Sequence, residues 1–205
     1  TLKNEMLIAM KKNFEEEKAQ LRETIQKQEK EIDVLQDSLA EHMLKSIQIR
    51  EKGGPAADEK EEWLNLVTEA ENAAEKYRPF AEILGVRIQV TASEERIIVK
   101  AAKNNIRKIF GNIIENSLKY MHSEGVIVIT LSHIENQTLI VIKDNGRGCG
   151  KEKTEKIFEK FYQGEEGQSG SGMGLFVVKE LVEQKDGTIY AKSEKGKGMA
   201  IYIEL

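Results

Sequence analysis

All 16 glycines of this 205-residue chain lie from residue 53 onward, and the first 52 residues contain neither glycine nor proline. Glycine and proline are the residues that most often interrupt regular structure, so the N-terminal quarter is predicted to be helical. Gly53-Gly54-Pro55 then stops a helix. We predict a helical dimerisation segment over residues 1–52, a linker over 53–61 and a globular domain over 62–205.

Apolar residues in the N-terminal part recur at spacings of three, four and seven, which place them on one stripe of a helix. Asn13 and Glu16 can form a capping box, which favours a helical hairpin turning near Asn13. One uninterrupted helix over 2–51 is the alternative, because no glycine or proline enforces the turn. In both cases the stripe lacks a partner within the chain, so we expect a homodimer through the N-terminal helices. The stripe consists of Leu21, Ile25, Ile32, Leu35, Leu39, Met43 and Ile47.

The composition argues against several functional classes. The net charge of −4, from 31 basic and 35 acidic residues, provides no overall basic field, so we expect no nucleic-acid partner. No uncharged apolar run approaches the roughly 20 residues that span a bilayer. We therefore expect no membrane contact in this chain and a cytoplasmic location, as part of a longer protein that could itself be anchored in a membrane. The single cysteine, Cys149, excludes an internal disulfide.

From Trp63 onward, short apolar runs alternate with amphipathic stretches. Two antiparallel strand pairs and three helices indicate an α+β fold, a two-layer α/β sandwich with the helices on one face of a mixed sheet. Trp63, Phe80, Phe110 and Phe176 are then expected in the core. The predicted strands are 63–67, 86–90, 97–100, 126–131, 138–143, 188–192 and 199–204, and the predicted helices are 68–84, 103–121 and 173–184.

The predicted helix over 103–121 has two opposite faces. Its apolar side chains form one face, while Asn112, Glu115, Asn116 and Lys119 recur at i, i+3, i+4 and i+7 on the other. Such a row can be an ordinary solvated face. Asparagine is nevertheless a poor helix former, and its amide oxygen is a hard donor suited to Mg²⁺. The row is therefore a candidate ligand site.

Two glycine-rich stretches follow. Residues 143–150 come directly after a predicted strand, where an ionised Asp144 can accept a hydrogen bond from an exocyclic amine such as that of adenine. A tight Asp-Asn-Gly turn is the alternative. Residues 164–174 lead into an apolar helix, whose N-terminal N–H groups suit phosphates, with a flexible surface linker as the alternative. The second stretch is neither a P-loop nor a Rossmann turn, because it lacks Gly-Lys-Ser/Thr and follows a helix.

In their order and spacing these stretches resemble the motifs of the histidine protein kinases. Asn112-Ile-Ile-Glu-Asn-Ser-Leu-Lys-Tyr120 is similar to their N box, and Asp144-Asn-Gly-Arg-Gly148 to their G1 box. Ile157-Phe-Glu-Lys-Phe-Tyr162 resembles their F box, and Gly170-Ser-Gly-Met-Gly-Leu175 their G2 box. The resemblance covers residues 62–205. It implies the Bergerat ATP-binding fold that gyrase, Hsp90 and MutL share, with ATP and Mg²⁺ as cofactors.

The resemblance also implies roles for single residues around the nucleotide. Asn116 would coordinate Mg²⁺, with Asn112 and Lys119 near the phosphates. Tyr120 would line the adenine pocket, and Asp144 would bind the adenine amine.

The glycine-rich boxes would complete the site. Gly146 and Gly148 would let the base approach, and residues 162–172 would form an ATP lid anchored by Phe158 and Phe161. The G2 box would bind the cofactor through Gly170, Gly172, Met173, Gly174 and Leu175, with Gly172 and Gly174 at the polyphosphate.

Within this superfamily the residues favour a kinase. The hydrolysing relatives have a glutamate where this chain has Asn112, and a neutral amide cannot take a proton from water. We therefore expect the ATP-binding catalytic portion of a two-component sensor histidine kinase, which transfers the ATP γ-phosphoryl group to a histidine for relay to a response regulator receiver domain. The alternatives are a degenerate, non-catalytic nucleotide-binding dimer and a gyrase-, Hsp90- or MutL-type ATPase.

The histidine that accepts the phosphoryl group in this family is not found at the expected place. Residues 31–53 resemble the second helix of the dimerisation and phosphotransfer bundle, and residues 1–12 would be a shortened first helix without its histidine. His42 is a weaker candidate, with a place beside the dimer interface as the alternative. We expect that this chain alone does not autophosphorylate.

Overall fold

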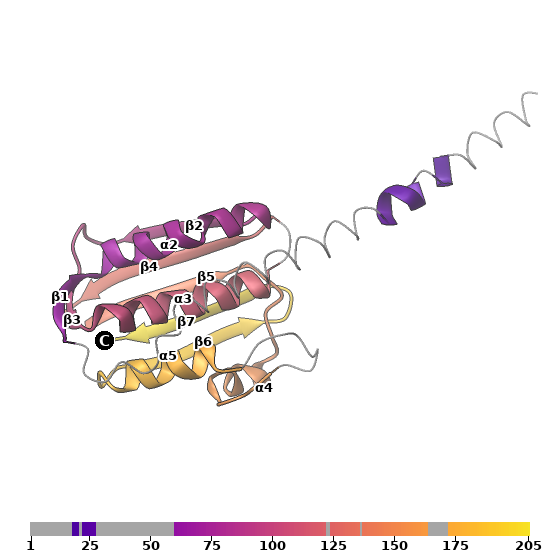
Figure 1. Cartoon of the computed structure of the whole chain (residues 1–205). Helices are drawn as coiled ribbons and strands as arrows, with labels where there is room; N and C mark the ends of the chain where they lie inside the picture. The colour runs from indigo at the N-terminus through magenta and orange to yellow at the C-terminus, as the bar shows by residue number, and fades with distance from the viewer. Residues whose placement is uncertain (1–17, 21, 28–59, 122–123, 136, 164–171) are drawn as a thin grey trace, which may run out of the picture. The chain divides into compact units, whose positions relative to one another are not determined.

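The computed structural model describes residues 18–20, 22–27, 60–121, 124–135, 137–163 and 172–205 (Figure 1). In the N-terminal part, residues 18–20 and 22–27 are helical, and the Thr24 hydroxyl donates a hydrogen bond to the Gln20 carbonyl oxygen at 2.9 Å. These residues agree with the predicted helix. The turn near Asn13, most of the apolar stripe and of the linker, and His42 lie outside the described residues.

A five-stranded mixed sheet forms the base of the C-terminal part. Its strand order is β2-β4-β5-β7-β6, and only the β2–β4 pair is parallel among these neighbours. The two predicted antiparallel pairs, β4 with β5 and β6 with β7, are both confirmed. The strands are β2 Arg87–Ala92, β4 Val126–Ile134, β5 Gln137–Asp144, β6 Thr188–Glu194 and β7 Gly198–Glu204.

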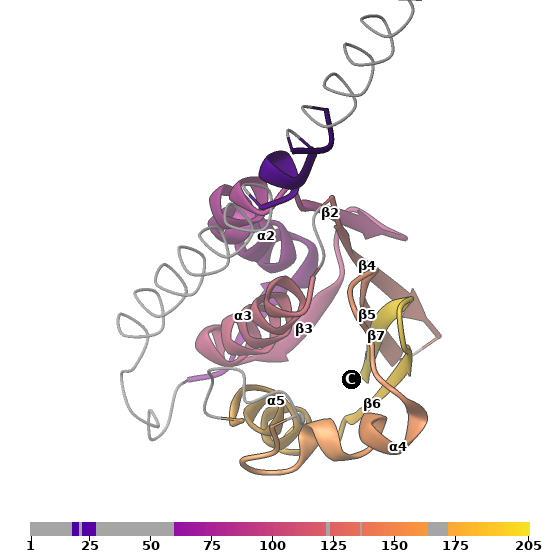
Figure 2. The same ribbon diagram turned by 90° about the vertical axis from the view of Figure 1, so that its right-hand side faces the viewer.

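Three long helices lie on one face of this sheet, as the edge-on view of Figure 2 shows. They are α2 Leu66–Ile83, α3 Lys103–Lys119 and α5 Gly174–Glu183, and α3 contacts both of the others. The predicted two-layer α+β sandwich is therefore confirmed. A short helix α4 (Lys151–Thr154) and a 3₁₀ turn η1 (Lys156–Phe158) follow β5, where the sequence pattern predicts neither.

The core forms where alternate strand residues meet the apolar faces of the helices. Ile127, Ile129 and Leu131 of β4 are fully buried, whereas Val128 and Thr130 between them are not. Successive side chains of a strand point to opposite faces of the sheet, so the first set packs under the helices. Burial of this apolar surface is the main source of stability, at roughly 25 cal/mol per Å².

Trp63 lies outside the core, so its prediction as a core aromatic is wrong. It belongs to β1 (Glu62–Asn65), which pairs only with β3 (Ile98–Ala101) in a separate two-stranded sheet. Leu64 is buried at 6% exposure, and its neighbour Trp63 is 73% exposed because it points to the opposite face. Phe110 is fully buried, and Phe80 and Phe176 are half-buried.

Helix α2 begins two residues before its predicted start. The Asn65 side-chain oxygen accepts hydrogen bonds from the backbone N–H groups of Val67 at 3.2 Å and Ile97 at 3.1 Å. Asparagine is among the best residues for this N-cap position. The cap divides the apolar run over 63–67, predicted as one strand, between the end of β1 and the first turn of α2.

Candidate functional site

Asp144 is the last residue of β5, and its side chain is buried with only 8% of the residue exposed. Its Oδ1 accepts hydrogen bonds from the backbone N–H groups of Gly146 at 3.0 Å and Met199 at 3.1 Å. Its Oδ2 accepts one from the Ser117 hydroxyl at 3.0 Å. Burial raises the pKa of the Asp144 carboxyl above its ordinary value, and the three hydrogen bonds act against that rise.

The Asp144 carboxylate has capacity for a further donor. Two carboxylate oxygens offer about four acceptor positions, and Oδ2 uses one of its positions on Ser117. A hydrogen bond to a charged acceptor away from bulk water is of the strong kind. Asp144 can therefore select a ligand that presents an N–H or NH₂ group.

The loop after β5 is held in place by close backbone contacts. The Arg147 N–H donates a hydrogen bond to the Tyr120 carbonyl oxygen at 2.9 Å. A Cβ atom on Gly146 would lie 2.5 Å from that same oxygen, and one on Gly148 would lie 2.2 Å from the Glu194 carbonyl oxygen. The protein's own backbone thus requires glycine at both positions. Their role in admitting a base stays a prediction.

The polar row of α3 faces two different neighbours. The Asn112 side-chain amide donates to the Lys108 carbonyl oxygen at 2.8 Å, and its Oδ1 would lie 3.0 Å from a Cβ on Gly174 at the start of α5. Glu115 accepts a hydrogen bond from the Tyr77 hydroxyl of α2 at 2.7 Å. Asn112 therefore belongs to the α5 side of α3, and Glu115 belongs to the α2 side.

Asn116, Lys119 and Tyr120 are half-buried at the C-terminal end of α3. The Lys119 ammonium lies 5.1 Å from the centroid of the Tyr120 ring. Within the described ranges, no three His, Cys, Asp or Glu side chains gather as metal ligands. A Mg²⁺ ion at the Asn116 amide would therefore take most of its oxygen ligands from phosphates and water, which is how Mg²⁺ is commonly held.

The start of α5 offers backbone donors. Met173 is its N-cap residue, and the Met173 side chain makes no capping hydrogen bond. The first N–H groups of a helix lack partners within the helix, and its dipole favours an anion there. Leu175 is buried at 7% exposure and anchors this end in the core. Gly172 and Gly174 lie at the same end, and Gly170 lies outside the described residues.

The two phenylalanines predicted to anchor the lid differ in environment. Phe158 is buried at 7% exposure, as an anchor should be, but Phe161 is 64% exposed. The prediction that the Phe161 side chain is an anchor is therefore not supported. The Phe161 backbone N–H instead donates to the Gly172 carbonyl oxygen at 3.1 Å, which brings residues 161 and 172, on either side of the predicted lid, together. Residues 164–171 lie outside the described part.

Three residues of this region were missed by sequence reasoning. Ser117 and the Met199 N–H bind Asp144, and Tyr77 binds Glu115. A signal existed for Ser117, because it is a hydroxyl on the apolar face of an amphipathic helix, and a buried hydroxyl needs a partner. No local signal identifies the Met199 N–H, since every residue except proline carries one.

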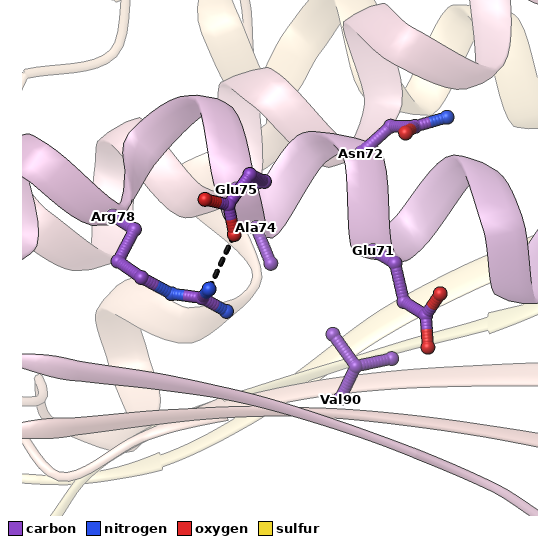
Figure 3. Close-up of a pocket in the computed structure, with 6 residues that line it drawn as sticks. All are labelled: Glu71, Asn72, Ala74, Glu75, Arg78 and Val90. Atoms are coloured by element: carbon purple, nitrogen blue, oxygen red, sulfur yellow. Dashed lines mark hydrogen bonds and ion pairs between the residues drawn. The ribbon is translucent and has the colours of Figure 1, made fainter.

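A hollow of about 430 Å³ lies between α2 and β2 and contains none of the predicted site residues (Figure 3). An ion pair between Arg78 and Glu75 lies in its wall. Both partners are exposed, so this pair contributes little to stability. The hollow is lined by Glu71, Asn72, Ala74, Glu75, Arg78 and Val90.

Residues 101–205 match the protein family described as histidine kinase-, DNA gyrase B- and HSP90-like ATPase. Sensor protein SrrB of Staphylococcus aureus is 31% identical over 134 residues, which are 63% of this chain and 23% of SrrB. The chain thus spans about a quarter of the length of the curated relatives it matches. None of the helices in the described part has the length and apolarity to cross a membrane.

Solved structures share the fold at low sequence identity. The catalytic domain of histidine kinase ThkA has a TM-score of 0.65 and 19% identity, over 71% of this chain and 95% of that chain. The mycobacterial sensor histidine kinase MprB has a TM-score of 0.63 and 23% identity, over 71% of this chain and 96% of that chain. Full-length ShkA has a TM-score of 0.66 and 24% identity, over 84% of this chain and 34% of that chain.

Proposed function

Because the chain belongs to the family of histidine kinase-, DNA gyrase B- and HSP90-like ATPases, we propose that it is the ATP-binding catalytic part of a two-component sensor histidine kinase. It would transfer the γ-phosphoryl group of Mg²⁺–ATP to a histidine, for relay to a response regulator. The buried Asp144 carboxylate, with an acceptor position left on Oδ2, is the observation that carries the proposal.

Asp144 would recognise the base. The amine of adenine is a donor of the kind that Oδ2 can accept, and the other hydrogen bonds keep the carboxylate from rotating. Tyr120 would line the same pocket, since its carbonyl oxygen contacts the loop that carries Gly146 and Gly148. ShkA, which shares the fold, was solved in complex with AMPPNP, which supports a nucleotide as the class of ligand.

The phosphates of the nucleotide would be bound by two structural elements. One is the N-terminus of α5, and the other is α3, through Asn112, Asn116 and Lys119. A Cβ on Gly174 would lie 3.0 Å from Asn112 Oδ1, so Asn112 lies beside the first N–H groups of α5. The Asn116 amide would bind Mg²⁺, which neutralises phosphate charge when bound. Met173 and Leu175 would keep α5 in position, and Gly170, Gly172 and Gly174 would let the chain approach the phosphates.

The position of Glu115 argues against an ATP-hydrolysing switch. Asn112 cannot act as a general base, and Glu115 is the only acid in the polar row of α3. Its carboxylate binds the Tyr77 hydroxyl of α2, away from the start of α5. Because the polar row of α3 offers no base at the start of α5, water is a poor acceptor of the phosphoryl group there, and a histidine presented by another segment is favoured.

The wider assembly follows the same proposal. Residues 1–52 would form the dimerisation helices, 53–61 a linker and 62–205 the catalytic domain. Ile25 of the apolar stripe is 45% exposed within one chain, which supports a homodimer that covers it. A histidine kinase of the same fold, ThkA, was solved in complex with the response regulator TrrA, and a receiver domain is the partner we propose.

Incubation of the chain with γ-labelled ATP and Mg²⁺ tests the proposal. We expect nucleotide binding, little release of phosphate, no label on the chain, and acid-labile label on an acceptor helix of a sensor histidine kinase supplied separately. Asp144→Asn is the matched variant, because its amide keeps the shape but places a donor beside Ser117, and it should lose binding and labelling together. Steady phosphate release by the wild-type chain would instead indicate an ATPase. Label on His42 would overturn the prediction that this chain lacks the acceptor histidine.

A further inference from the structure

Tyr77 of α2 has an almost fully buried side chain whose hydroxyl points at the polar row of α3. The residue is 1% exposed, and its hydroxyl donates to Glu115 Oε1 at 2.7 Å. A Cβ on Gly111, one helical turn earlier in α3, would lie only 3.1 Å from the same hydroxyl. The hydroxyl therefore contacts α3 at two successive turns, one by a hydrogen bond and one by close packing.

Glu115 stands between the residues proposed for the phosphate end. It follows Asn112 by three residues and precedes Asn116 by one. Each residue of an α-helix is rotated by about 100° from the one before, so any rotation of α3 about its axis moves all three side chains together. A tether on Glu115 thus sets the direction in which the two amides point.

A second polar contact holds the other end of α3 to the same helix. Glu69 of α2 has a side chain with 5% exposure and lies 3.3 Å from the Lys103 ammonium and 3.4 Å from Arg107 Nε. On its opposite side, α3 lies close to the start of α5. A Cβ atom added to Gly174 would lie only 3.0 Å from Asn112 Oδ1, so there is little room for α3 to move toward α5. Helix α3 is therefore fixed along its length on the α2 side and limited on the α5 side.

We propose that Tyr77 is a positioning residue: through Glu115 it fixes the rotation of α3, so that Asn112 and Asn116 face the phosphates and the metal ion. This rests on the proposed function. A purely structural role is the competing account, because a buried tyrosine hydroxyl needs some partner wherever it lies. The two accounts differ in what removal of the hydroxyl should do. A positioning role predicts weaker binding of the phosphates and the metal ion only, whereas a purely structural role predicts no such selective loss.

The positioning role and the purely structural role can be distinguished with the variant Tyr77→Phe. Its affinities for Mg²⁺–ATP, metal-free ATP and adenosine are measured. We expect Mg²⁺–ATP affinity to fall by about threefold to tenfold, less than the worth of a direct hydrogen bond to a charged group because Tyr77 acts through Glu115, and metal-free ATP affinity to fall less. Adenosine, which carries no phosphate and binds no metal ion through one, should bind as to the wild type. A destabilised core variant that removes no polar contact, Ile203→Val on β7, is the control for stability alone and should leave all three affinities unchanged.

Variants of Glu115 complete the test. Glu115→Gln keeps an acceptor for the hydroxyl and should behave like the wild type, whereas Glu115→Leu should reproduce Tyr77→Phe. The double variant Tyr77→Phe/Glu115→Leu should then be no worse than either single one, because the two act as a unit. A lower melting temperature with unchanged Mg²⁺–ATP affinity, equal losses for adenosine, or additive effects would overturn the proposal. Failure of the wild-type chain to bind adenosine or ATP at all would overturn the proposed function and this inference with it.

Discussion

The two ends of the proposed nucleotide site are built differently. At the base end, Asp144 is buried and receives three hydrogen bonds from three separate segments. At the phosphate end, Asn112, Asn116 and Lys119 are half-buried, and the Met173 side chain at the start of α5 makes no capping hydrogen bond. The base end is thus already oriented by the protein and keeps one acceptor position for a ligand, whereas the phosphate end offers helix N–H groups that have no partner within the helix.

This difference suggests a division of roles. A group that is already oriented loses little freedom on binding, so its contacts contribute more of their energy to affinity. We infer that the base end supplies most of the affinity of any adenine nucleotide, and that the phosphate end distinguishes nucleotides by their phosphates and metal ion.

Removal of the Asp144 carboxylate should have the largest effect. Loss of a hydrogen bond to a charged group costs about 1.5–3 kcal/mol, so Asp144→Ala should weaken ATP binding by roughly tenfold to a hundredfold. Titration calorimetry measures this, with the exposed acid variant Glu152→Ala as control. An unchanged dissociation constant in a folded Asp144→Ala protein would remove Asp144 from the site.

A change at the phosphate end should instead act through the metal ion. Asn116→Ala should reduce the gain in ATP affinity that Mg²⁺ provides by about fivefold to tenfold, the worth of about one polar contact. Adenosine binding should stay the same, because that ligand does not reach Asn116. If the variant keeps the full Mg²⁺ effect, Asn116 is not the ligand, and the difference between the two ends loses its main support.

The pH dependence of binding sharpens the description of the base end. A carboxylate that accepts from adenine loses this ability when it is protonated, so ATP affinity should fall as pH decreases through the raised pKa of Asp144. Ser117→Ala removes a hydrogen bond that lowers this pKa, and should move the fall toward higher pH. Binding curves of the two proteins at matched pH values show the difference, since protonation of the nucleotide itself is common to both. Coincident curves would show that Ser117 has no influence on the carboxylate.

Phe161 should give the smallest effect. Its side chain is 64% exposed, and exposed substitutions usually change stability by no more than about 0.5 kcal/mol. Phe161→Ala should therefore leave the melting temperature nearly unchanged, while Phe158→Ala, in the buried position, should lower it clearly. Equal losses in the two variants would show that Phe161 packs against the domain after all.

Much of the fold could be predicted from the sequence because the relevant signals are local. The β-branched runs over 126–131 and 138–143 predict strands, and the apolar spacing in 103–121 predicts an amphipathic helix; both are confirmed. Asp144 was a candidate because an acid before closely spaced glycines at a strand end is visible in a few consecutive residues. Where one element ends was less certain, as Asn65 shows by dividing an apolar run between β1 and α2.

The remaining features were decided only by tertiary structure, because they join residues far apart in the sequence. Because β1 pairs with β3, the Trp63 side chain faces solvent. The local sequence does not indicate this, since Trp63 is an apolar residue next to the buried Leu64. Ser117 lies 27 positions and Met199 55 positions from Asp144, so neither follows from the local pattern. The direction of Glu115 depends on Tyr77, 38 positions away. Sequence periodicity determined which faces are apolar, and the packing of α2, α3 and the sheet determined which polar groups meet, since a hydrogen bond depends on distance in space and not on spacing along the chain.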